Sequence, residues 1–215
     1  MRKKNVIVFA CAVILLVGFF SLREVLLFRA ASKGSMTGLR ILVGAGVNVN
    51  ARDPEGETPL MYASVEDRTQ AVLLLLRKGA EINAVSTNNE TALGRAAAMG
   101  RTETVKILVE KGANMEKGGD HGTTPLMYAS SGGHLQTVRS LLQMGSRVNS
   151  EDQDGDTALS YASIRGAPKN ILVELIGAGG DVEHRNKQGK TVAMLAAENG
   201  HRELTEFLKE TGKKQ

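Results

Sequence analysis

Histidine and aspartate side chains are the first candidates in this sequence for binding a metal or taking part in catalysis. The four histidines lie in different parts of the chain: His121, His134, His184 and His201. No two are four residues apart, which is the spacing of a helical metal site. Asp152, Asp154 and Asp156 alternate like the start of a calcium loop, but no glutamate stands at the twelfth position. No glycine-rich phosphate loop follows a strand. We therefore predict no catalytic residue, no metal and no cofactor.

The elements that hold these residues repeat with a period of 33. One ladder consists of threonines, with steps of 33, 33, 33 and 34: Thr58, Thr91, Thr124, Thr157 and Thr191. A second ladder consists of glycines and contains the same single insertion: Gly46, Gly79, Gly112, Gly145, Gly179 and Gly212. Two independent ladders with one period indicate a repeat protein.

Each threonine precedes a short helical pattern. Thr58-Pro59-Leu60-Met61 is typical: threonine caps the helix, proline takes its first position, and leucine and the following Ala63 share a face. A glycine such as Gly100 then ends the first helix. A second helix carries an apolar pair such as Leu108-Val109 and ends at the glycine ladder, where a short strand-like tail and a turn follow.

These motifs resemble the ankyrin repeat over residues 23–212. The resemblance implies an all-α solenoid of helix-turn-helix units with β-turn fingers, behind one hydrophobic N-terminal helix. The expected units are 23–52, 53–85, 86–118, 119–151, 152–185 and 186–215, the first without a finger. His134 and His201 occupy the family's Gly-His position and are expected to be structural.

The sequence departs from the family pattern at three places. The histidine usual after the helical leucine is absent, and residues such as Met61 and Gly94 replace it, so we expect more loosely held fingers. Asn89 replaces a turn glycine, which asparagine tolerates. The fifth unit has one extra residue near Pro168, which predicts a longer loop between its helices.

The N-terminus resembles an export signal. Arg2, Lys3 and Lys4 precede the apolar residues 6–22, which include the only cysteine, Cys11. Phe19 to Leu22 form a poor cleavage site, so we favour an uncleaved anchor over a cleaved signal peptide, and both over a buried core helix. The positive-inside rule then places the repeats outside the cytoplasm, in a periplasm or equivalent compartment.

Charge argues against nucleic acid as a partner. Subtracting Arg2, Lys3 and Lys4 from 27 basic residues leaves 24, against 23 acidic residues. A nucleic-acid binder is expected to carry a basic stripe on its folded part. The partner is therefore expected to be another protein, with membrane contact through residues 6–22 if they are retained, and the chain is expected to be a monomer.

In ankyrin proteins, partners usually bind the concave face made by finger tips and first helices. Carried onto this sequence, that face comprises Glu55, Glu57, Tyr62, Val65, Asn88, Glu90, Arg95, Met99, Asp120, His121, Tyr128, Ser131, Asp154, Asp156, Tyr161 and Arg165. Its acidic tips are either a solvated edge or a rim for a basic partner patch. The tyrosines and Arg95 share one repeat position and either pack between repeats or anchor a partner.

We expect an exported or membrane-tethered binding module, not an enzyme, that restrains another envelope protein. Two alternatives stay open: an envelope scaffold without an inhibitory role, and an anchored ankyrin domain that faces the cytoplasm. The restraining role rests on analogy, because a fold does not determine a function.

Overall fold

The computed structural model describes residues 21–213. The predicted signal or anchor, residues 6–22, lies outside the described residues except for Ser21 and Leu22. Those two belong to the first repeat: Ser21 caps helix α2 in a reciprocal capping box with Glu24, and Leu22 is the first helical residue. Within residues 21–213, no helix combines the length and hydropathy that a membrane span requires.

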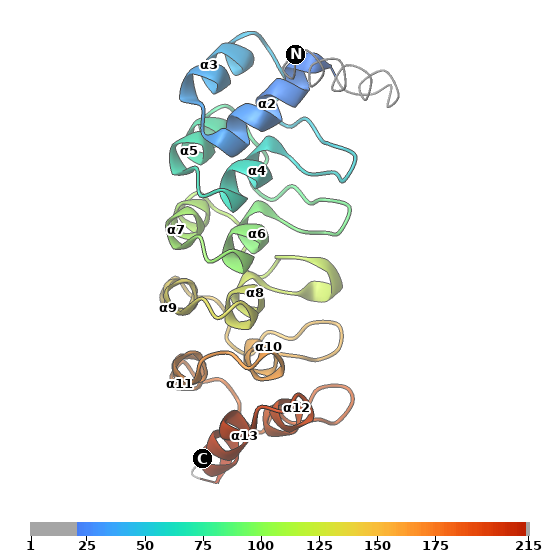
Figure 1. Cartoon of the computed structure of the whole chain (residues 1–215), viewed down its shortest axis with the longest axis vertical. Coiled ribbons are helices and arrows are strands. Elements are labelled where there is room, and N and C mark those ends of the chain that lie inside the picture. The colour runs from blue at the N-terminus through green and yellow to red at the C-terminus, as the bar shows by residue number, and fades with distance from the viewer. Residues whose placement is uncertain (1–20, 214–215) are drawn as a thin grey trace, which may run out of the picture.

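The described chain is an all-helical solenoid of six stacked helix pairs (Figure 1). The first helices of the pairs are α2 (Leu22–Lys33), α4 (Pro59–Val65), α6 (Ala92–Ala98), α8 (Pro125–Ser131), α10 (Ala158–Arg165) and α12 (Val192–Glu198). The second helices are α3 (Met36–Gly44), α5 (Thr69–Arg77), α7 (Thr102–Glu110), α9 (Leu135–Gln143), α11 (Lys169–Gly177) and α13 (Arg202–Gly212). The predicted fold class is confirmed.

The threonine ladder starts the first helices as expected. The hydroxyl oxygens of Thr58, Thr91, Thr124, Thr157 and Thr191 each accept a hydrogen bond from the backbone N–H three residues on, at 3.0–3.4 Å. Met61 occupies the family's histidine position, and its sulfur accepts from the Thr58 N–H at 3.4 Å. The thioether therefore completes the cap that a polar side chain usually provides.

The glycines end the helices through left-handed backbone. Gly100 after α6 has φ +66°, and Gly112 after α7 has φ +90°, conformations that cost a glycine little. Asn89 takes φ +54° in its turn, as predicted. The prediction was wrong for Gly212, which is the last residue of α13 and not a residue that follows the helix.

Two other predictions concern the connections between helices. The strand-like tails were wrong, because residues 21–213 contain only one isolated bridge, Arg185–Thr191, and the tails are turns. The longer loop of the fifth unit is confirmed: Ala167 and Pro168 separate Gly166 from α11, whereas the preceding unit places only His134 between Gly133 and α9.

Apolar stacking and polar bridges join successive repeats. Leu93 and Ala96 of α6, and Leu126 and Ala129 of α8, are at most 1% exposed, so adjacent first helices pack closely. At the family's Gly-His position, side chains reach back to a carbonyl oxygen of the previous repeat: Arg68 to Ser32 (3.0 Å), Arg101 to Val65 (2.7 Å), His134 to Ala98 (2.9 Å) and His201 to Ile164 (3.0 Å). The structural role expected for His134 and His201 is confirmed.

Candidate protein-binding surface

A finger precedes the first helix of each repeat from the second to the sixth, and the fingers form one side of the solenoid (Figure 1). Each finger takes the number of its repeat. Backbone N–H groups link neighbouring tips: Thr87 donates to the Glu55 oxygen at 2.9 Å, Gln153 to His121 at 2.7 Å, and Lys187 to Asp154 at 2.9 Å. Between the third and fourth fingers, the Asn89 amide donates to the Asp120 carboxylate at 3.3 Å. The tips therefore form one connected edge along the stack.

A polar residue at the start of each regular finger shapes its turn. In the fifth finger, one carboxylate oxygen of Asp152 accepts from the backbone N–H groups of Asp154 and Asp156, at 2.9 and 2.8 Å. Its other oxygen accepts from the Tyr161 hydroxyl at 2.8 Å. Both oxygens are thus engaged in holding the finger, which explains the spacing that resembled a calcium loop. The described residues contain no group of three or more potential ligands placed to hold a metal ion.

Tyrosine hydroxyls tie two of the fingers to their helices. Tyr62 donates to Asp53 at 2.9 Å in the second repeat, and Tyr161 donates to Asp152 in the fifth. The Tyr62 ring also packs edge-on against Phe28 of α2, with ring centroids 5.3 Å apart. The expectation of loosely held fingers is therefore wrong for these two repeats. Both tyrosines contribute to repeat packing, whether or not they also contact a partner.

These bonds predict a loss of stability in alkali. Burial, then the hydrogen bond to Asp53, raises the pKa of Tyr62 to about 12, and burial is the main cause that raises the pKa of Tyr161 to about 12. Tyrosine in an unfolded chain titrates near 10. A pKa raised by folding means that the protonated phenol stabilises the fold fully below about pH 10, and that this contribution is lost as the pH rises toward about 12.

We therefore expect Tyr62→Phe with Tyr161→Phe to lower the free energy of unfolding near pH 7 by about 0.5–1.5 kcal/mol per lost hydrogen bond. The double variant should then lose less stability than the parent between about pH 9 and pH 11. Denaturant titrations at several pH values measure both effects. Identical pH dependence in the two proteins contradicts the assignment.

The fourth finger differs from the others, and sequence reasoning missed it. Gly118 and Gly119 both donate backbone hydrogen bonds to the Thr123 oxygen, and the tip forms a short 3-10 turn, η1 (Asp120–Gly122). A Cβ on Gly119 would lie 2.0 Å from the Tyr128 hydroxyl oxygen. Tyr128 therefore occupies the space that the turn-shaping side chain fills in other fingers. The adjacent glycines Gly118 and Gly119 were the feature of the sequence that could have indicated this different turn.

Arg95 neutralises part of the acidic rim. Its guanidinium forms an ion pair with Glu57 of the preceding finger and lies 3.7 Å from a Glu90 carboxylate oxygen. All three side chains are half-buried, with exposures between 18% and 31%. The rim is therefore weaker than its count of acidic residues indicates, and Arg95 faces carboxylates of its own chain.

Three of the acidic tip residues remain exposed: Glu55, Asp120 and Asp154. Hydrogen bonds from the His121 backbone and from the Asn89 amide lower the pKa of Asp120. Asp156 is half-buried and accepts from the Asn186 amide at 3.0 Å, and burial raises its pKa. The exposed acidic side chains of the rim therefore come from one finger tip in each of three repeats.

The other predicted site residues lie on the same elements. Asn88 and His121 are exposed at the tips, whereas Val65 and Ser131 are half-buried at the ends of α4 and α8. Met99 follows α6 directly and is 52% exposed, and the exposed Arg165 ends α10. All sixteen positions thus belong to the fingers, the first helices or the residue that follows such a helix, which makes this surface a candidate for protein recognition.

Stacked helix pairs with projecting fingers define a helical-repeat protein. A family model for ankyrin repeats in three copies matches residues 27–118, 74–152 and 114–172. The chain belongs to the ankyrin-repeat family.

Among solved structures, the chain is similar to a chain of the complex described as the predatory endopeptidase Bd0816 from Bdellovibrio bacteriovorus with immunity protein Bd3460. The TM-score is 0.76 at 29% sequence identity, and the match covers 86% of this chain and 97% of that one. No curated protein sequence matches the chain closely enough to serve as a relative.

Proposed function

We propose that this chain is a non-catalytic binding protein that holds, and thereby restrains, an enzyme of the cell envelope. The observation that carries the proposal is the likeness to a chain of an endopeptidase–immunity protein complex, which extends over nearly the whole of both chains. By analogy with that complex, an endopeptidase is the kind of enzyme that we expect this chain to bind. The ankyrin fold supports protein recognition. It does not by itself imply inhibition, which is proposed from the similar complex.

The surface made of finger tips and first helices suits a partner with a basic patch. Its tips carry the exposed acids Glu55, Asp120 and Asp154, and the predicted tip positions of the second to fifth repeats hold no Lys or Arg. Charges on a rim accelerate encounter more than they strengthen the final complex. Behind them, Met99 offers an exposed apolar contact and Tyr128 an aromatic one near the centre of the stack. Aromatic residues in such positions often dominate binding energy.

An extracytoplasmic location belongs to the same proposal. Its support is the basic start and the apolar residues 6–20, together with the similar chain, which belongs to a complex of an endopeptidase and an immunity protein. A reporter fused after Gln215 tests it. Reporter activity only outside the cytoplasm supports export, whereas activity only inside favours the cytoplasm-facing alternative.

The direct test is to capture the partner and measure its activity. The full chain, tagged at its C-terminus, is used to isolate bound proteins from an envelope extract. If the captured protein is an enzyme, its turnover is measured with increasing amounts of the chain. Inhibition at stoichiometric amounts supports a restraining role, whereas stable binding without inhibition favours the scaffold alternative.

Charge reversal at two exposed tips tests the binding surface. We expect Glu55→Lys with Asp154→Lys to slow association with a basic partner and to reduce its salt dependence, because steering weakens. Glu57 is unsuitable for this purpose, since its loss leaves Arg95 without its ion-pair partner. A matched control is Glu110→Lys with Glu206→Lys, which makes the same charge change at exposed positions of the second helices α7 and α13.

Surface plasmon resonance at several salt concentrations measures both pairs of variants. The control pair should associate at the parental rate. If the finger variants also keep the parental rate and salt dependence, the acidic rim is not the binding surface. Circular dichroism spectra and melting curves then show whether each variant is folded.

A further inference from the structure

The two ends of the solenoid differ in character. Residues 21–213 contain seven large hydrophobic side chains that are exposed, and four of them belong to the first helix pair: Leu22 (55% exposed), Val25 (38%), Leu26 (42%) and Ile41 (65%). The last helix, α13, instead exposes Glu206, Lys209 and Glu210. Terminal repeats need a polar outer face to remain soluble, and only the C-terminal end has one.

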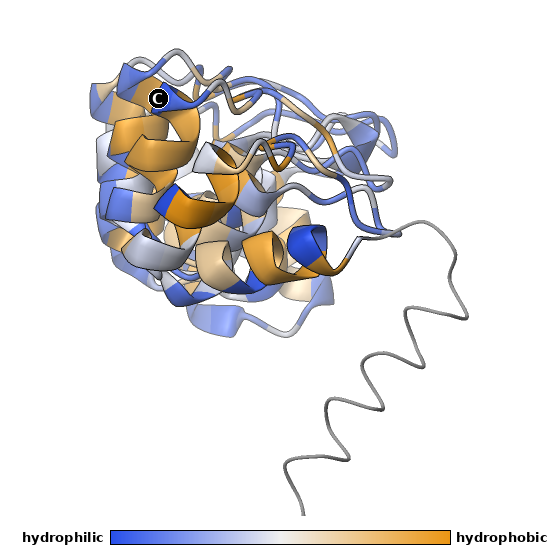
Figure 2. Ribbon diagram, turned by 90° about the horizontal axis from the view of Figure 1, so that it is seen from above, coloured by the Kyte–Doolittle hydropathy of each residue, from blue (hydrophilic) through white to orange (hydrophobic). Residues whose placement is uncertain are grey.

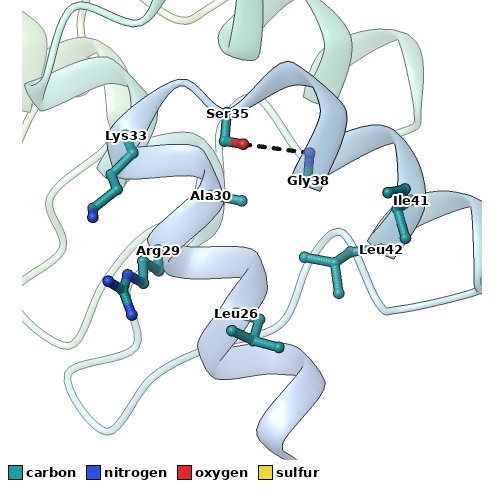
Figure 3. Close-up of a pocket in the computed structure, with 8 residues that line it drawn as sticks. All are labelled: Leu26, Arg29, Ala30, Lys33, Ser35, Gly38, Ile41 and Leu42. Atoms are coloured by element: carbon teal, nitrogen blue, oxygen red, sulfur yellow. Dashed lines mark hydrogen bonds between the residues drawn. The ribbon is translucent and has the colours of Figure 1, made fainter. Parts of the chain in front are cut away.

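The exposed side of α2 continues as a basic stripe. Leu22, Val25, Leu26, Arg29 and Lys33 follow one another at intervals of one helical turn or less, so they share one side of the helix. Figure 3 shows Leu26 and Ala30 facing a groove, with Ile41 and Leu42 of α3 on its other side. Arg29 and Lys33 project from the side of α2 that faces away from α3. Seen from this end, orange hydrophobic segments of the helices alternate with blue hydrophilic positions (Figure 2).

The charge of this end is strongly positive. Residues 21–44 contain Arg23, Arg29, Lys33 and Arg40 against a single acid, Glu24. The Glu24 carboxylate is occupied at the helix start, where it accepts from the Ser21 backbone N–H at 2.8 Å. An apolar strip bordered by Arg and Lys is typical of helices that lie in the headgroup region of an anionic bilayer.

We propose that this N-terminal end face, made of the exposed sides of α2 and α3, rests on an anionic membrane surface. Its apolar side chains enter the boundary between headgroups and acyl chains, and Arg29 and Lys33 contact lipid phosphate. The apolar residues 6–20 end directly before Ser21, so the sequence that could enter a membrane leads straight into this face. The solenoid then stands on its first repeat, which leaves the fingers free to bind a partner.

Single-tryptophan variants test the proposal, because the chain contains no tryptophan. Full-length Ile41→Trp is reconstituted into vesicles of phosphatidylcholine and phosphatidylglycerol, with and without brominated acyl chains. We expect a blue-shifted emission and strong quenching by the brominated lipid. Full-length Met194→Trp is the matched control, because Met194 is also exposed (47%) but belongs to α12 near the other end. Its emission should stay unquenched.

A second comparison separates contact of the end face with the lipid from tethering through residues 1–20. Adding Arg29→Glu and Lys33→Glu to the Ile41→Trp chain keeps residues 1–20 intact. The quenching should fall to the level of the Met194→Trp control, and high salt should weaken it in the parental background. Persistent quenching after both reversals overturns the charge-dependent contact.

Two other occupants of the face give different results. If residues 1–20 cover it, the Ile41→Trp emission is already blue-shifted before vesicles are added, and brominated lipid leaves it unchanged. If a second copy covers it, the blue shift depends on protein concentration in the absence of lipid. Either result overturns the proposal without bearing on the partner proposed for the surface of finger tips and first helices.

Discussion

Replacing Leu126 by alanine is expected to lower the free energy of unfolding by about 2–5 kcal/mol. Leu126 lies in α8, is 1% exposed, and belongs to a helix that packs against α6 on one side and α10 on the other. Truncation removes buried apolar surface and leaves a cavity between three repeats. A solenoid is stabilised by contacts between neighbours, so a defect in the centre weakens two interfaces at once.

Leu208→Ala is the matched comparison, because Leu208 is also fully buried, in the terminal helix α13. The exchange removes the same atoms, but the damage can be confined to the last repeat, which unfolds locally while the others stay folded. We expect a smaller loss in global denaturant titrations and faster hydrogen exchange restricted to residues 192–212. Equal global losses for the two variants contradict a one-dimensional stack.

The repeat ladders account for most of what the sequence predicted correctly about the fold. A threonine cap, a helical leucine and a left-handed glycine each act locally, so their spacing predicts helix boundaries without knowledge of tertiary structure. The strand-like tails failed because alternating residues such as those in Gly46-Val47-Asn48-Val49 fit a turn as well as a strand. Gly212 failed because it lacks the left-handed backbone of the other ladder glycines and is instead the last residue of α13.

The candidate surface was predictable in position but not in its interactions. The repeat register alone places a residue on a finger or a helix, which is why the sixteen positions lie on the expected elements. Pairing depends on distances between repeats, and sequence did not reveal that Arg95 meets Glu57 across 38 positions or that Tyr62 binds Asp53. The Arg95–Glu57 contact neutralises charge on the face. The Tyr62–Asp53 contact holds a ring that could otherwise turn toward a partner.

Replacing Gly94 by alanine is expected to destabilise the protein by about 3 kcal/mol, the upper end for overpacking a core, because backbone lies in the way. A Cβ at Gly94 would lie 2.0 Å from the Gly118 carbonyl oxygen, which also accepts from the Thr91 N–H at 3.1 Å. The other repeats hold Met61, Met127, Ser160 and Met194 at this position. The missing side chain at Gly94 thus leaves room for the backbone of the altered fourth finger, which packs directly against α6.

Gly177→Ala provides the control, because Gly177 is also helical and a Cβ there would have nothing within 4 Å. That exchange is expected to stabilise the protein by about 0.4–1 kcal/mol, since alanine reduces the freedom of the unfolded chain. Denaturant titrations of the two variants should therefore shift in opposite directions. A neutral Gly94→Ala shows that the fourth finger can move aside, and a variant that does so should also expose Tyr128, detectable as a lower phenol pKa in an ultraviolet titration, because burial is the main cause that raises this pKa in the parent.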